Sequence, residues 1–106
     1  MATRIIDTEN KILVGDNHPQ LKIGDKCYIV DDRQSTWSKM GDVLTGKANS
    51  KDPDYDFVKL ALGKKAADEI LKDITVSGME NLTTYIIAAM RNITFEEAQE
   101  FINGKN

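Results

Sequence analysis

The fold is decided first by residues 21–30, which read Leu21-Lys22-Ile23-Gly24-Asp25-Lys26-Cys27-Tyr28-Ile29-Val30. Gly24 and Asp25 suit the two central positions of a type II′ turn, where glycine takes the positive φ. A two-residue turn at this point predicts a β-hairpin that places Leu21 opposite Tyr28. The side of the hairpin that is the better candidate for the core then carries Leu21, Ile23, Tyr28 and Val30.

The opposite side of the predicted hairpin carries Cys27, which we expect to be a small buried hydrophobe because its strand context is apolar. Two short β-branched pieces at residues 5–6 and 11–14 precede the hairpin, and residues 15–19 have the composition of a loop. The β part is therefore either the hairpin alone or a small antiparallel sheet with a third strand.

Helical periodicity begins directly after the hairpin. Asp32 is the predicted N-cap of a helix from about Arg33 to Leu44. A second helix is predicted to begin at Asp52-Pro53, because proline at the first helical position loses no needed N–H. Gly63 interrupts the apolar pattern of this second helix, and the sequence leaves open whether it divides two helices or bends one. The apolar stripe of the first helix consists of Trp37, Met40, Val43 and Leu44.

The cleanest amphipathic pattern follows Ser77, a candidate helix cap. Ile87 and Ala88 lie off its main stripe, so this helix is apolar over more than one face and is expected to be central or part of an interface. Residues 94–97, Thr-Phe-Glu-Glu, form a capping box for a last helix. The stripe of the penultimate helix is Leu82, Tyr85, Ile86, Ala89, Met90 and Ile93. The residues expected to face inward from the last helix are Phe95, Ala98, Phe101 and Ile102.

The grouping of strands first and helices later predicts an α+β fold. We expect an N-terminal β-hairpin or small antiparallel sheet followed by four to five helices. The 106 residues are enough for one domain and too few for two. The predicted organisation is a single domain over residues 1–106, with a β-rich part at 1–31 and a helical part at 32–103.

The composition limits the classes of function. The net charge of −3 counts against a protein that grips nucleic acid by its phosphates. The single cysteine excludes an internal disulfide and a cysteine-based zinc site. The longest apolar run, residues 85–90, is far short of the roughly 20 residues of a membrane span. No signal-peptide pattern opens the sequence, so the expected location is the cytoplasm.

Three motifs of catalysis or ion binding fail on their spacing. His18, the only histidine, lies beside proline in a polar loop and has no nucleophile at a suggestive spacing. Residues 52–56 alternate acids like an EF-hand, but its sixth and twelfth positions are Phe57 and Gly63. Residues 63–65, Gly-Lys-Lys, lack the other positions of a phosphate-binding loop. We therefore expect a non-enzymatic protein with no catalytic, cofactor-binding or metal-binding residues.

Four segments carry a resemblance to the tail assembly chaperones of long-tailed bacteriophages and prophages of Gram-positive hosts. Residues 21–32 resemble the opening hairpin of those proteins, and residues 56–70 are similar to their Leu-Gly-Lys-x-x-Ala-x-Glu-Ile segment. Residues 85–90 and 94–101 resemble their penultimate Ile-x-Ala-x-Met helix and their final Phe-Glu-Glu-Ala helix. The likeness extends over about residues 20–103.

This resemblance implies a chaperone that binds the tape-measure protein and brings tail-tube protein to it. A client with exposed apolar stripes requires an apolar face on the chaperone, and a long client favours a homo-oligomer. The candidate partner-binding residues lie on the penultimate helix, and the alternative is that all of them are core. These residues are Met79, Leu82, Ile86, Ile87 and Met90. The alternative function is a small regulatory module that binds DNA or a host protein through its helical half.

Overall fold

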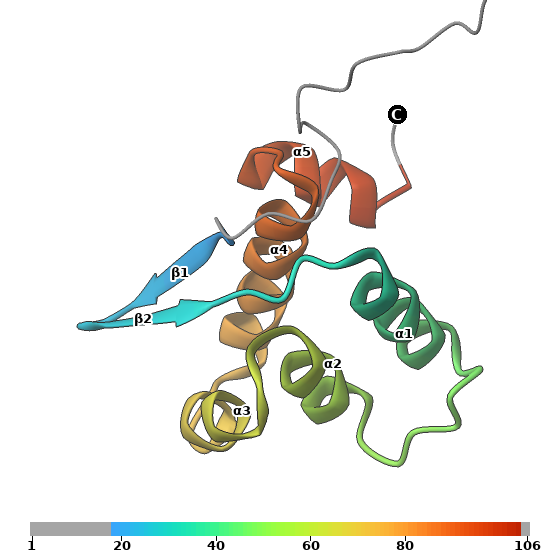
Figure 1. The fold of residues 1–106 in the computed structure, drawn as a ribbon, viewed down its shortest axis with the longest axis horizontal. Helices are drawn as coiled ribbons and strands as arrows, with labels where there is room; N and C mark the ends of the chain where they lie inside the picture. Colours follow the sequence, from blue (N-terminus) through green and yellow to red (C-terminus); the bar gives the residue numbers. More distant parts are fainter. Residues whose placement is uncertain (1–17, 105–106) are drawn as a thin grey trace, which may run out of the picture.

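The computed structural model describes residues 18–104, and the short β-branched pieces predicted at 5–6 and 11–14 lie outside this range. Within it the chain forms a two-stranded antiparallel sheet followed by five helices, so the predicted α+β fold is confirmed (Figure 1). The strands are β1 (Gln20–Ile23) and β2 (Lys26–Ile29). The helices are α1 (Gln34–Thr45), α2 (Pro53–Leu62), α3 (Lys64–Leu71), α4 (Val76–Arg91) and α5 (Phe95–Ile102).

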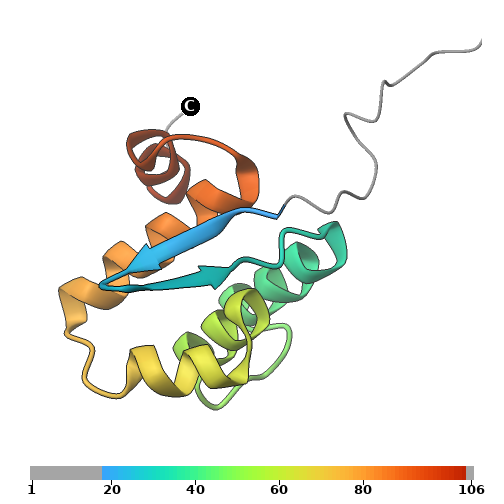
Figure 2. The same cartoon turned by 60° about the vertical axis from the view of Figure 1, so that its left-hand side comes forward.

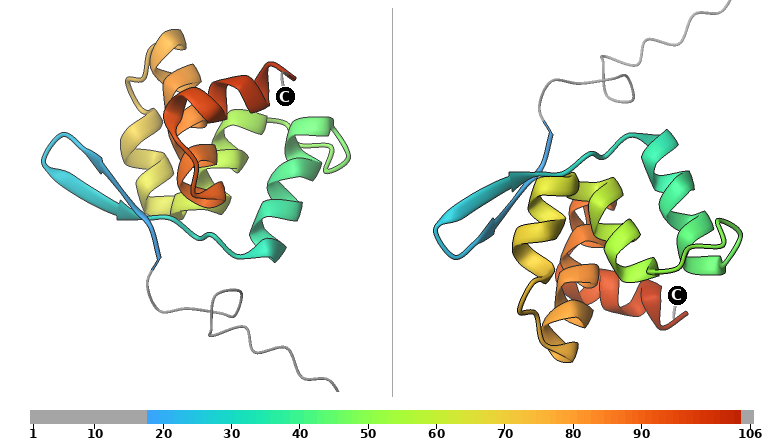
Figure 3. Two further views of the ribbon diagram at one scale, coloured as in Figure 1. Left: turned by 90° about the horizontal axis from the view of Figure 1, so that it is seen from above. Right: turned by 90° about the horizontal axis from the view of Figure 1, so that it is seen from below.

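The hairpin has the predicted register, with Leu21 opposite Tyr28. Gly24 has a φ of 62°, whereas the φ of Asp25 is not positive. A type I′ turn requires a positive φ at both residues, so the turn is of type II′. The backbone N–H of Val30 donates to Pro19 O at 2.9 Å and extends the pairing by one residue. Figure 3 shows that the tip of the hairpin points away from the helices.

The two faces of the hairpin differ in exposure. Val30 is fully buried, and Leu21 and Tyr28 are half-buried on the side toward the helices, as predicted. Ile23 shares this side but lies at the hairpin tip, where its side chain is exposed. The prediction that Cys27 is buried is wrong, because its side chain lies on the outer side of the two-stranded sheet, where residues 18–104 leave it exposed.

Helix α1 begins one residue later than predicted. Its N-cap is Arg33, and Asp32 does not cap it because the Asp32 carboxylate accepts a hydrogen bond from His18 Nδ1 at 2.8 Å. Asp31 organises the helix start instead, accepting from the Thr36 hydroxyl at 2.8 Å and from the Arg33 guanidinium. These contacts fix the angle at which the chain leaves the hairpin.

The buried stripe of α1 is also shifted from the predicted one. Thr36, Met40 and Val43 are buried, whereas the Leu44 side chain is 56% exposed. Positions 36, 40 and 43 lie on one face of a helix, and residue 44 lies about 100° around from residue 43. The placement of Leu44 in the core is therefore wrong.

The start of α2 is the one predicted from Asp52-Pro53. Asp52 Oδ1 accepts a hydrogen bond from the Tyr55 backbone N–H at 3.2 Å, with Pro53 at the first helical position. Gly63 divides α2 from α3, since its φ of 96° and ψ of 162° are not helical. The backbone N–H of Asp31 donates to Ala61 O at 2.8 Å, which ties the exit of the hairpin to the end of α2.

Helix α4 occupies the centre of the molecule (Figure 1). Its N-cap is Thr75, whose hydroxyl accepts from the Gly78 backbone N–H at 2.9 Å, so the predicted cap at Ser77 is wrong. Thr75 has the extended backbone of an N-cap, while Ser77 already lies inside the first turn. Figure 2 shows the hairpin lying across α4, with which β1 makes contact.

Helix α5 begins with the predicted capping box. The Glu97 backbone N–H donates to the Thr94 hydroxyl and the Thr94 N–H donates to the Glu97 carboxylate, each at 3.0 Å. Ala98 is fully buried, but Phe101 and Ile102 are exposed, which corrects their predicted inward orientation. The exposed Phe101 ring packs instead against Trp37 of α1, with the two ring centroids 6.1 Å apart.

The core lies between α1, α2 and α4. Its largest fully buried side chains are Phe57, Met40, Ile86, Val30 and Val58. Among residues 18–104 every buried side-chain nitrogen or oxygen has a hydrogen-bond partner. No helix in this part of the chain is both long and apolar enough to cross a membrane.

Candidate functional site

The five predicted partner-binding residues do not form one continuous exposed surface. Leu82, Ile86 and Ile87 are buried in the core cluster, which agrees with the alternative interpretation for these three. Met79 and Met90 remain half-buried. They are eleven residues apart on α4, which corresponds to about 16 Å along the helix axis. The accessible part of the predicted surface is therefore its two ends.

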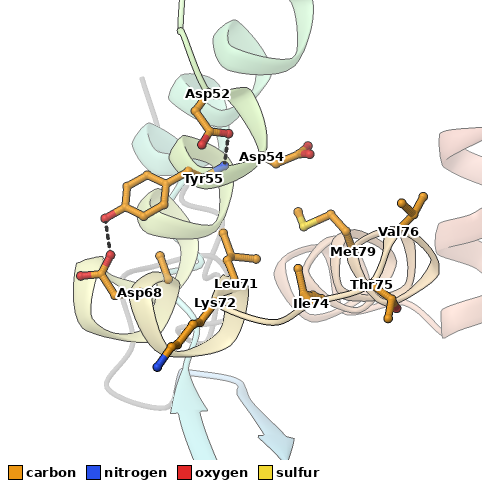
Figure 4. Close-up of a pocket in the computed structure, with 11 residues that line it drawn as sticks. Asp52, Asp54, Tyr55, Asp68, Leu71, Lys72, Ile74, Thr75, Val76 and Met79 are labelled. Atoms are coloured by element: carbon orange, nitrogen blue, oxygen red, sulfur yellow. Dashed lines mark hydrogen bonds between the residues drawn. The ribbon is translucent and has the colours of Figure 1, made fainter.

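Met79 lines a cleft of about 450 Å³ between α2 and α3 on one side and the start of α4 on the other (Figure 4). We call this the Met79 cleft. Figure 4 shows Asp54 extending from α2 and Met79 extending from α4 into the same space. The apolar wall of the cleft consists of Leu71, Ile74, Val76 and Met79. Its acidic rim consists of Asp52, Asp54 and Asp68.

The acidic rim follows from the way in which the two helices on this side begin and pack. Asp52 caps α2, and Asp54 lies in the first turn of α2, where the helix dipole favours an acid. Asp68 comes from α3 and accepts a hydrogen bond from the Tyr55 hydroxyl at 2.7 Å and one from Lys64 Nζ at 2.9 Å. The turn at Gly63 brings α3 back beside α2, so that the three carboxylates lie along one edge.

Asp68 is the carboxylate of the acidic rim with the most side-chain hydrogen bonds, and these affect its pKa. The hydrogen bond from Lys64 and that from the Tyr55 hydroxyl lower the pKa of Asp68. In return, the Asp68 carboxylate raises the pKa of Tyr55 and that of Lys64. Asp68 therefore carries its negative charge at neutral pH.

The apolar wall depends on the tight first turn of α4. A Cβ atom at Gly78 would lie 2.9 Å from Thr75 Oγ1 and 3.1 Å from Ile74 Cγ1. Only glycine therefore leaves room for Ile74 to fold back against the first turn while Thr75 caps it. The side chain of Val76, the first residue of α4, is 81% exposed beside the cleft.

Two of the further hollows are lined in part by α4. One, of about 600 Å³, lies between β1, Ile70 of α3 and the α4 residues Leu82 and Tyr85. The other adjoins Trp37 and Arg91, where the Arg91 guanidinium lies 5.6 Å from the Trp37 ring centroid and 4.6 Å from that of Phe101. That guanidinium already occupies the face of both rings.

His18 and Cys27 both lie outside the Met79 cleft. His18 is engaged by Asp32, and Cys27 is exposed on the outer side of β2. In the described range 18–104, no three histidine, cysteine, aspartate or glutamate side chains gather closely enough to hold a metal ion. The Met79 cleft combines an apolar wall with fixed negative charge, an arrangement suited to holding a partner side chain.

Sequence reasoning found Met79 but not the opposite side of its cleft. The acids at 52–56 fail as an EF-hand by their spacing, and in the structure Asp52 caps α2 and Asp54 lies in its first turn. Nothing in the spacing of Tyr55 and Asp68, thirteen residues apart, indicates that they meet. The position of Gly63 between them is the one signal that could have suggested it.

Comparison with known proteins adds no relative. No model of a known protein family, no curated protein and no solved structure matches the chain. The basis for a functional proposal is therefore the geometry of the chain together with the resemblance of its four segments.

Proposed function

We propose that this protein is a non-enzymatic tail assembly chaperone of a bacteriophage or prophage, which binds the tape-measure protein and assists tail-tube assembly. The order of the four resembling segments supports the proposal, because each coincides with a separate element of the fold. Residues 21–32 include the hairpin and the approach to α1, and residues 56–70 span the break between α2 and α3. Residues 85–90 lie in α4 and residues 94–101 in α5 with its cap.

The observation that carries the proposal is the Met79 cleft. A chaperone keeps an assembly protein soluble by covering its apolar side chains without making or breaking a bond. Such a protein needs an accessible apolar surface next to a stable core, and the cleft supplies one at the end of α4. Met79 suits this role because the unbranched methionine side chain adapts to different contacts. Self-association of the chaperone along a long client belongs to the same proposal.

Co-expression of the full chain with the tape-measure protein of the same gene cluster tests this function. We expect the tape-measure protein to move into the soluble fraction and to elute together with the chain. Replacement Val76→Glu should reduce the yield of the complex, because it places a charge beside the apolar wall. Leu44→Glu is the matched control, since Leu44 is also an exposed aliphatic side chain but lies on α1, away from the cleft.

Two outcomes would contradict the proposed function. One is a tape-measure protein that is no more soluble with the chain than without it. The other is a salt-dependent shift of duplex DNA by the chain at physiological ionic strength, which would favour the regulatory module instead. If the complex still forms with Val76→Glu, the proposed function stands, but the contact with the tape-measure protein lies outside the Met79 cleft.

A further inference from the structure

We infer that the Met79 cleft takes an amphipathic helix of a partner protein, in which the apolar side chains are flanked by lysine or arginine. This inference rests on the proposed function for the identity of the client. The chemistry of the bound helix is inferred from the residues that line the cleft. A volume of about 450 Å³ falls within the range of roughly 300–1,000 Å³ that is typical of ligand pockets.

The backbone surroundings of the cleft favour a helix over an extended segment. An extended peptide gains much of its affinity by pairing its backbone with the open edge of a strand. The lining residues of the Met79 cleft belong to α2, α3, the following loop and α4, so no strand edge borders it. A helix already satisfies its own backbone groups and needs only side-chain contacts. Helix-in-groove docking is therefore the mode that this cleft can support.

The charge of the lining selects the polar residues of the partner. Three carboxylates line the cleft against one amine, that of Lys72. Figure 4 shows the Lys72 amine on the side away from Met79, whereas Asp54 extends toward α4. Within residues 18–104, Asp54 forms no hydrogen bond or ion pair through its side chain. Lys64 is ion-paired with Asp68, and the N-terminus of α2 contributes about half a positive charge beside Asp52, so Asp54 carries the negative charge that is left for a partner.

The apolar wall selects the anchoring residues. Val76 is the most exposed large hydrophobic side chain among the described residues, and Met79 extends beside it into the cleft. Leu71 and Ile74 close the wall and are themselves half-buried. The other hollows lack this combination. The β1 hollow has no acid in its lining. Each of the remaining three has a single acid together with at least one lysine or arginine.

A pair of synthetic peptides of about 18 residues, or five helical turns, tests the inference on the full chain. One peptide is an amphipathic Leu/Lys helix and the other has Glu in place of every Lys. Fluorescence anisotropy of the labelled peptides measures binding. We expect the Leu/Lys peptide to bind and the Leu/Glu peptide to bind at least about tenfold more weakly, because its charges oppose the acidic rim.

Matched variants locate the bound peptide. We expect Asp54→Lys to weaken binding of the Leu/Lys peptide by about tenfold, and Asp42→Lys, which changes the net charge equally on α1, to leave it within about twofold. Met79→Glu should weaken binding to a similar extent. Should Met79→Glu unfold by circular dichroism, Val76→Glu replaces it, since that exposed position carries little packing.

The inference is overturned if Asp42→Lys weakens binding as much as Asp54→Lys, because the attraction then comes from the overall charge alone. It is also overturned if the Leu/Glu peptide binds equally well. Its failure is distinguishable from that of the proposed function. If the peptide binds at the cleft but the tape-measure protein stays insoluble, only the proposed function is contradicted. If the tape-measure protein becomes soluble but Asp54→Lys has no effect on peptide binding, only the inference is contradicted.

Discussion

The middle of α4 and its first turn contain similar apolar residues but have opposite surroundings. Ile86 and Ile87 are buried on a helix that contacts α2, α5 and β1, whereas Val76 and Met79 border an open cleft. The helix is apolar over more than one face because neighbours surround its middle, and not because a partner must cover it. Apolar periodicity therefore identifies a central helix, while accessibility at its end identifies the surface that a partner can reach.

The largest effect is expected from shortening a side chain in the buried middle of α4. We expect Ile86→Ala to lower the free energy of unfolding by about 2–5 kcal/mol, because a fully buried side chain leaves a cavity. Met79→Ala, on the same helix, should cost less than about 1 kcal/mol while weakening binding of the Leu/Lys peptide. Urea unfolding of both variants gives the two values. Equal costs would mean that the Met79 cleft is part of the core.

A smaller effect is expected where the hairpin meets the helical part, at Asp31. Its hydrogen bonds with Arg33 and Thr36 hold the pKa of this carboxyl well below its ordinary value. A lowered pKa means that the ionised form stabilises the fold above about pH 4 and that this contribution is lost as the pH falls further. We expect Asp31→Asn to cost about 1–2 kcal/mol at pH 7.

Urea unfolding of the wild type and of Asp31→Asn at several pH values measures this contribution. The difference between the two proteins should shrink steadily below pH 4, because the carboxyl of the unfolded chain then binds a proton while the native carboxyl is still ionised. Asp42→Asn is the control, because the Asp42 side chain lies away from this junction on α1. A difference that is independent of pH would show that the Asp31 carboxylate contributes through packing and not through its charge.

The features that the sequence predicts well are those that depend on neighbours in the chain. The two-residue turn at Gly24-Asp25 determines the pairing of the hairpin, and the register follows without knowledge of the rest. The capping box at Thr94 and Glu97 and the start of α2 at Asp52 likewise depend on contacts three residues apart. Such contacts form whatever the surrounding fold is, so the local pattern suffices.

The features that the sequence predicts poorly depend on which elements cover which. Asp31 and Thr75 organise helix starts in place of Asp32 and Ser77, because the backbone path of the preceding loop selects among neighbouring polar residues. Leu44 and Phe101 have the right spacing for a core face, yet the described part of the chain leaves both side chains exposed. The Met79 cleft is of this kind, since one side comes from α2 and α3, which the turn at Gly63 joins, and the other side comes from the start of α4.

The smallest expected effect is that of replacing Cys27, whose side chain lies on the outer side of the hairpin. Its strand context is as apolar as that of Tyr28, but its side chain points to the uncovered side of the sheet. We expect Cys27→Ser to change the free energy of unfolding by less than about 0.5 kcal/mol, as for other exposed positions. The thiol of the native protein should react with a disulfide reagent about as fast as that of the urea-unfolded chain. Protection of the thiol until the protein unfolds would mean that a further layer covers this side of the hairpin.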